Sequence, residues 1–349
     1  MDTAVYASNV MSAIIPYATL EKIEMQDSFE RQIDYLRISI TDRCNLKCIY
    51  CIPDKQPEYF EKSEILTPDE IIRFVCIAHK HGLMKVRITG GEPLMRKDII
   101  SIISGIKKIG IQDLSITTNG TMLADMADAL KKAGLDRINI SLDTLDAGRY
   151  SNMTQGGNIQ YVWEAVNEAE RVGLDPVKIN VVPIRGVNDD EILKFASLTF
   201  DKNYHIRFIE LMPVGRNRRF KSDACVKKSE LIEKISALGE LVLLEFKGKG
   251  PSRNYRIKGA KGIIGFISPI SDCFCDYCNR LRLTAHGRIR PCLFSDIEVD
   301  IRTPMRNGIS DEELEALFFR AVTVKPSGHY FSKDSRPFSA PASMSKIGG

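Results

Sequence analysis

An alternation of short apolar strands with amphipathic helices constrains the fold more than any other feature of this sequence. Six segments read as strands, at residues 36–41, 85–89, 113–118, 136–143, 177–183 and 205–211. Helical patterns lie between them, at residues 68–80, 97–109, 122–133, 160–172 and 189–200. Strands that alternate with helices in this way form parallel βαβ units. The pattern predicts an incomplete (β/α)₆ barrel, with a flat doubly wound sheet as the alternative.

The pattern changes after about Ser222. A helix at residues 229–238 precedes short strands at 254–258 and 262–267, then a hairpin of 281–284 and 288–292. We expect this α+β region to close the open side of the barrel. The predicted division is a leader of uncertain order (1–30), a barrel (31–221), a C-terminal region (222–320) and a tail (321–349).

The composition is that of an ordinary globular protein, with 44% hydrophobic and 27% charged residues among 349. Lys and Arg outnumber Asp and Glu by 49 to 45, a surplus too small to indicate nucleic-acid binding. No apolar run reaches the ~18 residues that a membrane span needs. The first basic residue is Lys22, after the acidic Asp2, so the basic start of a secretory signal is missing. We therefore expect a cytoplasmic protein that binds neither membrane nor nucleic acid.

Cysteine spacing carries the first indication of function. The chain has nine cysteines, an odd number that argues against a disulfide framework. Seven of them fall into two tight groups, at positions 44, 48 and 51 and at positions 273, 275, 278 and 292. This clustering indicates metal sites.

The first group is a C-x₃-C-x₂-C run in the loop after the first strand, made by Cys44, Cys48 and Cys51. Soft thiolates suit iron–sulfur chemistry, and three of them can hold three irons of a [4Fe–4S] cubane. The fourth iron would stay open to another ligand. A zinc site completed by His79 or His81 is the alternative.

The second group is Cys275-x₂-Cys278-x₁₃-Cys292, with Arg280 and Arg282 on one face of the intervening strand. It indicates another three-cysteine cluster with an open iron, flanked by two guanidinium groups. A zinc knuckle with Cys273 as the fourth thiolate is the alternative.

Strand alternation places positive charge inside the barrel. On the strand at 85–89, Val86 and Ile88 would face the helices, so Lys85, Arg87 and Thr89 would point inward. Arg37, Lys178 and Arg207 lie on other predicted strands. Buried cations are costly unless a polyanion meets them, and a triphosphate would do so. The alternative is that these are solvated surface charges.

Two short motifs resemble those of the radical S-adenosylmethionine (SAM) superfamily. One is the cysteine run with an aromatic residue, Tyr50, before its last cysteine. The other is Gly90-Gly91-Glu92-Pro93 after the second strand, which resembles the superfamily's GGEP motif. The resemblance implies that Cys44, Cys48 and Cys51 hold a [4Fe–4S] cluster that binds SAM.

A second resemblance is narrower. Residues 274–294 (FCDYCNRLRLTAHGRIRPCLF) and the ending Gly348-Gly349 are similar to the C-terminal motifs of the GTP 3′,8-cyclase family, over about residues 33–349. Cys273 is additional to the family pattern. The resemblance implies a second [4Fe–4S] cluster on Cys275, Cys278 and Cys292. It also implies catalytic roles for Arg280, Arg282, Gly348 and Gly349, and SAM contacts at Tyr50, Gly91, Ser141 and Met212. The implied GTP contacts, with Lys85 and Arg207 as additions, are Arg37, Lys85, Arg87, Thr118, Lys178, Arg207, Arg280, Leu281 and Arg282.

The reaction implied by this resemblance is the first step of molybdenum cofactor (molybdopterin) biosynthesis. A radical derived from SAM removes the 3′ hydrogen of GTP, and the resulting carbon radical attacks C8 of guanine. The implied partners are GTP, a reducing electron donor and a cyclic pyranopterin monophosphate synthase that receives the product; a homodimer is left open. A radical SAM enzyme that modifies a peptide, or a zinc-dependent nucleic-acid binding module, are the alternatives.

Overall fold

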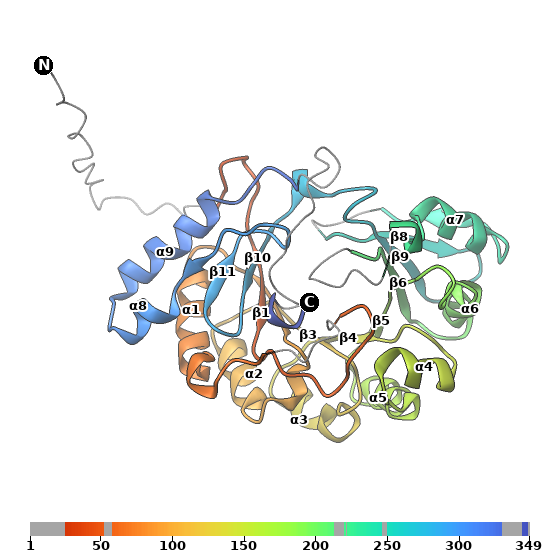
Figure 1. The fold of residues 1–349 in the computed structure, drawn as a ribbon, viewed down its shortest axis with the longest axis horizontal. Helices are drawn as coiled ribbons and strands as arrows, with labels where there is room; N and C mark the ends of the chain where they lie inside the picture. Colours follow the sequence, from red (N-terminus) through yellow and green to blue (C-terminus); the bar gives the residue numbers. More distant parts are fainter. Residues whose placement is uncertain are drawn as a thin grey trace, which may run out of the picture.

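The strands form a curved sheet with helices along its outer side, as Figure 1 shows. The computed structural model describes residues 25–51, 58–212, 220, 222–245, 250–329 and 344–347. The six predicted strands are β1 Tyr35–Ser39, β2 Lys85–Thr89, β3 Asp113–Thr118, β4 Arg137–Ser141, β5 Lys178–Val181 and β6 His205–Ile209. The helices of this part are α1 Pro68–Lys80, α2 Ile99–Lys108, α3 Ala127–Lys132, α4 Ala147–Thr154, α5 Ile159–Arg171 and α6 Ile192–Asp201.

The strand order distinguishes the barrel from the doubly wound alternative. Strands β1 to β6 lie side by side in chain order, and every neighbouring pair is parallel. A doubly wound sheet instead reverses its direction of winding at a switch point. The predicted incomplete (β/α)₆ barrel with a C-terminal α+β region is therefore confirmed.

The C-terminal region extends the same sheet at both edges. Next to β1, strand β10 is added in parallel, and β11 and β12 follow it in antiparallel pairs. Next to β6, strand β9 is added in parallel, and β8 and β7 follow it in antiparallel pairs. The predicted hairpin is present as β10 and β11. The elements are α7 Lys228–Ser236, β7 Leu241–Leu243, β8 Arg253–Ile257, β9 Ile263–Ile267, β10 Arg280–Leu283, β11 Arg288–Arg290, β12 Val299–Asp300, α8 Arg302–Arg306, α9 Asp311–Thr323 and α10 Met344–Ile347.

The core lies between the sheet and the helices around it. Val86 and Ile88 of β2 are completely buried there, which confirms the predicted alternation on this strand. Helix α1 begins with a capping box, because the Thr67 hydroxyl accepts from the backbone N–H of Glu70 at 3.2 Å and the Glu70 carboxylate accepts from that of Thr67 at 2.7 Å. These local signals fix the helix start and the inward face of the strand.

Some elements were not expected from sequence patterns. They are α4, α8, α9, α10, β7 and β12. Helix α4 is short and mostly polar (AGRYSNMT), and β12 has two residues, so neither carries a clear periodicity. Helix α9 runs to Thr323, past the predicted start of the tail.

The leader was expected at residues 1–30, but residues 25–30 belong to the folded body. Met25 is 1% exposed, and Asp27 forms an ion pair with Arg31 at 2.7 Å. Residues 1–24 lie outside the described residues. In the described part of the chain, no helix combines the length and apolar character required to cross a membrane.

Candidate active site between two cysteine groups

A cavity of about 580 Å³ lies inside the barrel and is lined by both groups of cysteines. These are Cys44, Cys48 and Cys51 from the loop after β1, and Cys275, Cys278 and Cys292 from the C-terminal region. The cavity is also lined by the residues predicted to contact SAM and by those predicted to contact GTP, apart from Leu281: Tyr50, Gly91, Ser141, Met212, Arg37, Lys85, Arg87, Thr118, Lys178, Arg207, Arg280 and Arg282. The fold therefore brings into one space residues that are far apart in the sequence.

The first cysteine loop is held in place by α4. The backbone N–H groups of Lys47 and Ile49 donate to the carbonyls of Thr154 and Met153, at 3.0 and 2.9 Å. Burial raises the pKa of Cys44 to about 11 and that of Cys51 to about 12. These thiols are therefore costly to ionise alone, and a positively charged iron cluster would supply the missing counter-charge. The donor set fits the predicted [4Fe–4S] cluster.

The Gly90-Gly91 turn packs directly on this cysteine loop. A Cβ on Gly91 would lie 2.3 Å from the carbonyl oxygen of Arg43 and 2.5 Å from its carbonyl carbon. The N–H of Gly91 donates to Thr41 O at 2.7 Å, and the N–H of Glu92 donates to Arg43 O at 2.8 Å. The close approach requires glycine, so the GGEP segment and the loop form one rigid unit.

The buried carboxylate of Glu92 extends this unit to β3. It accepts hydrogen bonds at 2.7 Å from both the Thr118 hydroxyl and the Asn119 N–H. The Asn119 side chain in turn donates to Cys44 Sγ at 3.9 Å. Burial raises the pKa of Glu92 to about 7. Because the Thr118 hydroxyl is bonded to Glu92, the structure places this predicted GTP contact beside the first cysteine group.

A second buried carboxylate, Asp143, positions Tyr50. The Tyr50 hydroxyl donates to Asp143 Oδ2 at 2.6 Å, and Asp143 Oδ1 accepts from the Val182 N–H at 2.7 Å. Burial raises the pKa of Asp143 to about 6. Tyr50 is thereby fixed at the ends of β4 and β5.

Lys325 organises the second cysteine group. Its Nζ donates to the carbonyls of Arg280 and Pro291, at 2.8 and 2.9 Å, and lies 3.6 Å from Cys278 Sγ. Burial alone would raise the pKa of Cys278, but the charges of Arg280 and Lys325 outweigh it and lower the pKa to about 6. A set of three cysteines in which one thiol ionises easily fits a second iron–sulfur cluster.

Strand register aligns arginines along the wall of the cavity. Arg37 of β1 lies opposite Arg282 of β10 on one side and Arg87 of β2 on the other. Arg280 precedes Arg282 on the same face of β10, and Arg207 of β6 lies opposite Asn180 of β5. Arg282, Arg37 and Arg87 thus lie side by side from the C-terminal region into the barrel, and Arg207 lies farther along the same wall.

Burial and the neighbouring positive charges lower the pKa values of several of these cations. Burial lowers the pKa of Lys178 to about 6, with further effects of Arg207, Arg137 and Arg87. Burial likewise lowers the pKa of Arg207 to about 9, with Arg87 contributing. The pKa of Arg37 is also lowered, by burial first and then by the positive charge of Arg282. Such a site is at its most stable with a bound polyanion.

Carboxylates do not balance this charge. The described residues that line the cavity include nine Lys and Arg but four Asp and Glu, which are Glu92, Asp113, Asp143 and Glu210. Among these four, Asp113 is the one that forms an ion pair with a lining cation, Arg137. The cavity therefore carries a surplus of positive charge.

Three residues named in the sequence analysis, Leu281, His79 and His81, do not line the cavity. The side chain of Leu281 is 1% exposed and belongs to the hydrophobic core, because alternation along β10 turns it away from the face of Arg280 and Arg282. His79 and His81 do not approach the first cysteines, since His79 hydrogen-bonds Leu83 O at 2.8 Å and His81 pairs with Glu315 at 2.9 Å. These contacts leave the zinc alternative for that loop without its histidine.

Helix α10 lies at the cavity. Met344 and Ser345 line it, and Ile347 is 2% exposed against Met212, Leu293 and Phe294. Gly348 and Gly349, which were predicted to be catalytic, lie outside the described residues.

Sequence reasoning missed several residues of this site. Glu92 belongs to the GGEP motif and Asp143 lies two residues after Ser141, but the sequence does not show that both carboxylates are buried. Arg137 is on β4 with the inward parity that had identified Arg87, and this signal could have found it. Lys325 and His329 fall in the segment assigned to the tail and carry no local signal.

Comparisons with known proteins agree with this geometry. Residues 38–199 match the Radical SAM superfamily, and residues 204–331 match the family described as Molybdenum Cofactor Synthesis C. A protein of Pelotomaculum thermopropionicum named GTP 3′,8-cyclase is 45% identical over 328 residues, which is 93% of this chain and all of the relative. One with the same name from Thermodesulfovibrio yellowstonii is 47% identical over 328 residues, with the same coverage.

Solved structures show the same fold at low sequence identity. Streptococcus suis SuiB bound to the precursor peptide SuiA has a TM-score of 0.58 and 17% identity, covering 75% of this chain and 60% of that protein. Native anSMEcpe with bound AdoMet has a TM-score of 0.55 and 13% identity, covering 85% and 82%.

Proposed function

This chain belongs to the GTP 3′,8-cyclase family of radical SAM enzymes, and we propose that its cavity is where GTP becomes (8S)-3′,8-cyclo-7,8-dihydroguanosine 5′-triphosphate. This conversion is the first step of molybdenum cofactor biosynthesis. The observation that carries the proposal is that two three-cysteine sets line one cavity whose wall is a row of arginines. The peptide-modifying alternative is not favoured, because the relatives compared above carry the cyclase name.

We assign one part of the cavity to SAM. Cys44, Cys48 and Cys51 would hold the cluster that binds it, and together these groups supply the radical that removes a hydrogen atom from the substrate. The contacts proposed for SAM are Tyr50, Gly91, Ser141 and Met212. Their support is the unit built by Gly91, Glu92 and Asp143, which keeps the cysteine loop and the strand ends in a fixed relation.

We assign the basic wall to GTP. Arg37, Lys85, Arg87, Lys178 and Arg207 would bind the triphosphate, since arginines bind phosphates bidentately and the cavity has a surplus of cations. Arg280 and Arg282 lie beside the Cys275, Cys278 and Cys292 set, which would hold a second [4Fe–4S] cluster at the guanine end. Thr118 lies in the cavity wall, where it would contact GTP while its hydroxyl donates a hydrogen bond to Glu92.

The proposed division of labour follows the sequence regions. Residues 31–221 bind SAM, 222–320 carry the second cluster, and 321–349 bring Gly348 and Gly349 to the substrate. An external reductant supplies the electron, and a cyclic pyranopterin monophosphate synthase consumes the product. We place the enzyme in the cytoplasm, where thiols stay reduced.

Metal analysis tests the two clusters. After anaerobic reconstitution, the chain is expected to hold iron and sulfide for two cubanes and little zinc. Stoichiometric zinc without iron would overturn the proposal.

Single cysteine variants test the division of labour. Cys48→Ser is expected to abolish SAM cleavage, whereas Cys278→Ser keeps some uncoupled cleavage to 5′-deoxyadenosine, because the first cluster alone delivers the electron to SAM. The exposed Cys76 on α1 provides the control, Cys76→Ser, which keeps full activity. Equal loss of cleavage in the Cys48 and Cys278 variants would contradict the assignment.

A further inference from the structure

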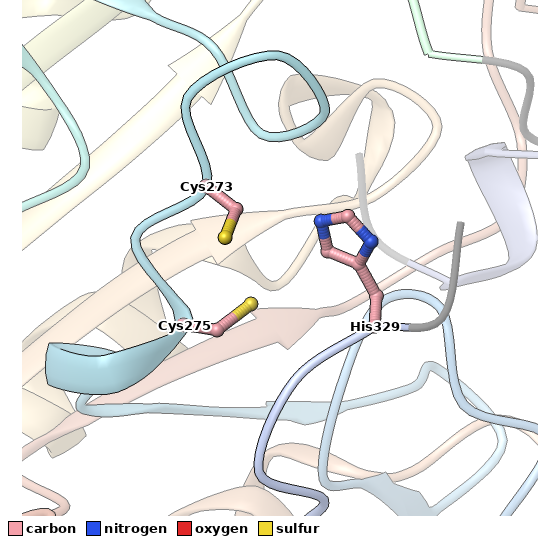
Figure 2. Close-up of side chains that lie close together, drawn as sticks. All are labelled: Cys273, Cys275 and His329. Carbon is pink, nitrogen blue, oxygen red and sulfur yellow. The ribbon is translucent and has the colours of Figure 1, made fainter. Parts of the chain in front are cut away.

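Cys273, Cys275 and His329 form a compact group beside the second cysteine set. Their ligand atoms all lie within 4.8 Å of one another, and no other three His, Cys, Asp or Glu side chains in the described residues do so. Figure 2 shows the two thiols and the imidazole converging from the loop before β10 and from the segment after α9. Ligand atoms on one zinc ion lie less than about 4.6 Å apart, twice a Zn–S bond. The group therefore needs little movement to hold a single ion.

Several contacts hold the group together without metal. The buried guanidinium of Arg31 donates to Cys275 O at 2.8 Å and to Ser327 O at 2.9 Å, which ties the segment before His329 to the cysteine. The His329 backbone hydrogen-bonds the Cys275 thiol. The imidazole Nε2 donates to Pro269 O at 2.5 Å, and this bond sets the orientation of the ring.

The three cysteines assigned to the cluster are arranged differently. Cys275, Cys278 and Cys292 do not form a group within 4.8 Å in the described structure. A cubane spreads its ligands over separate irons, whereas one ion draws them to a single point. Cys275 is the residue common to both sets.

We propose that, in the cluster-free protein, Cys273, Cys275 and His329 bind one divalent transition metal ion such as Zn²⁺ or Fe²⁺, and that this ion excludes the second cluster. Two thiolates and an imidazole are donors that both ions accept. Cys273 is exposed, so the ion enters from solvent. Binding releases the thiol protons, and coordination through Nε2 would replace its hydrogen bond to Pro269, so the affinity is below that of a dedicated structural zinc site.

The exclusion follows from Cys275. While this thiolate ligates the single ion, the cluster has two of its three cysteines. This part of the inference rests on the proposed second cluster, whereas the mononuclear site does not.

Cobalt binding tests the site. The test protein is the full chain with the substitutions Cys44→Ala, Cys48→Ala and Cys51→Ala, so that the first loop binds no metal. Co²⁺ is titrated anaerobically into this metal-free protein. We expect one Co²⁺ with thiolate charge-transfer absorption. Cys273→Ser and His329→Gln should each weaken binding by about tenfold or more, with the charge-transfer band halved in the first and kept in the second. Cys278→Ser and the Cys76→Ser control should change neither the Co²⁺ affinity nor the charge-transfer band. Circular dichroism checks that each variant is folded.

The opposite pattern of effects would overturn the proposed metal site. If Cys278→Ser abolishes Co²⁺ binding while Cys273→Ser does not, the ion is held by the cluster cysteines instead.

Reconstitution tests the exclusion. In the same background, one equivalent of Zn²⁺ added before iron and sulfide should slow formation of the second cluster several-fold, and Cys273→Ser should reduce this delay. An equal delay in both proteins would contradict the exclusion. Absence of any cluster without zinc, with Co²⁺ binding intact, would instead refute the proposed second cluster.

Discussion

At the scale of single residues, the site is defined by cations that lie next to one another in a buried cavity. Arg87 donates through Nε to the Ser115 hydroxyl at 3.2 Å, and its guanidinium lies over the Tyr35 ring at 5.6 Å. Both partners are neutral, so the charge of Arg87 remains available to a ligand. This arrangement leads to two predictions.

Arg87→Ala should weaken GTP binding by about 1.5–3 kcal/mol, the range for hydrogen bonds to charged groups. SAM binding should change far less, because the proposed SAM contacts are on other strands and loops. Isothermal titration calorimetry with each ligand measures both effects. Arg73→Ala is a matched control, since Arg73 pairs with Asp311 on the outer surface. Normal GTP affinity in the Arg87 variant would show that the inward arginine does not bind the triphosphate.

Lys178 should take up a proton when GTP binds. Burial and the neighbouring arginines lower its pKa to about 6, so it is mostly neutral at pH 7.5 in the free enzyme. A triphosphate raises this pKa, so the complex binds more protons than the free enzyme and GTP affinity rises as pH falls toward 6. Below pH 6 this contribution stays constant.

Calorimetry in buffers of different ionisation enthalpy measures the uptake. Lys178→Met should reduce it at pH 7.5 by an amount approaching one proton. Lys107→Met on α2, where Lys107 pairs with Asp136, should leave it unchanged. Identical uptake in the wild type and the Lys178 variant would contradict the prediction.

At the scale of elements, the GGEP turn and the cysteine loop work as one piece. The loop itself has few buried side chains, and its position comes from backbone contacts with α4 and with Gly91. A change at the turn should therefore be felt at the cluster.

Gly91→Ala should destabilise the chain by about 1–3 kcal/mol, because its Cβ would overlap the Arg43 backbone and the loop would have to shift. We expect loss of the first cluster and of SAM cleavage, with the second cluster retained. Urea unfolding and iron analysis measure the two effects. Gly148→Ala is the control, since a Cβ there meets Asp146 Oδ1 at 3.4 Å and no closer atom. Full iron content in Gly91→Ala would show that the close packing is not required.

At the scale of the whole molecule, the active site is assembled by the barrel strands β1 to β6, by β10 of the C-terminal region and by helix α10. The burial of Ile347 against Met212, Leu293 and Phe294 seats α10 at the cavity, immediately before Gly348 and Gly349. Residues without a Cβ can enter a narrow space, and a terminal carboxylate is attracted by arginines.

Deleting Gly348 and Gly349 should leave the fold, both clusters and most GTP affinity intact but remove cyclisation. Product analysis by mass spectrometry, with iron content and calorimetry alongside, tests this. A short peptide with the same ending should restore part of the activity. Ile347→Ser, which keeps both glycines but loses the apolar anchor, should lose activity as well. Full turnover by the truncated enzyme would show that the glycines have no catalytic role.

Local sequence determined the six barrel strands and most of their helices, the inward faces of the strands and the two cysteine sets, because periodicity and ligand spacing act over a few residues. The start of α1, the inward direction of Arg87 and the core side of Val86 all follow from such signals. Tertiary structure decided which distant residues meet. The pairing of β10 with β1 sets Arg282 opposite Arg37, and Lys325 and His329 reach the second cysteines from a segment that showed no pattern. Burial, which shifts the pKa of Glu92 and Lys178, likewise depends on contacts between segments far apart in the chain. Such contacts leave no periodic trace in the sequence because they form only when distant segments pack together in the folded chain.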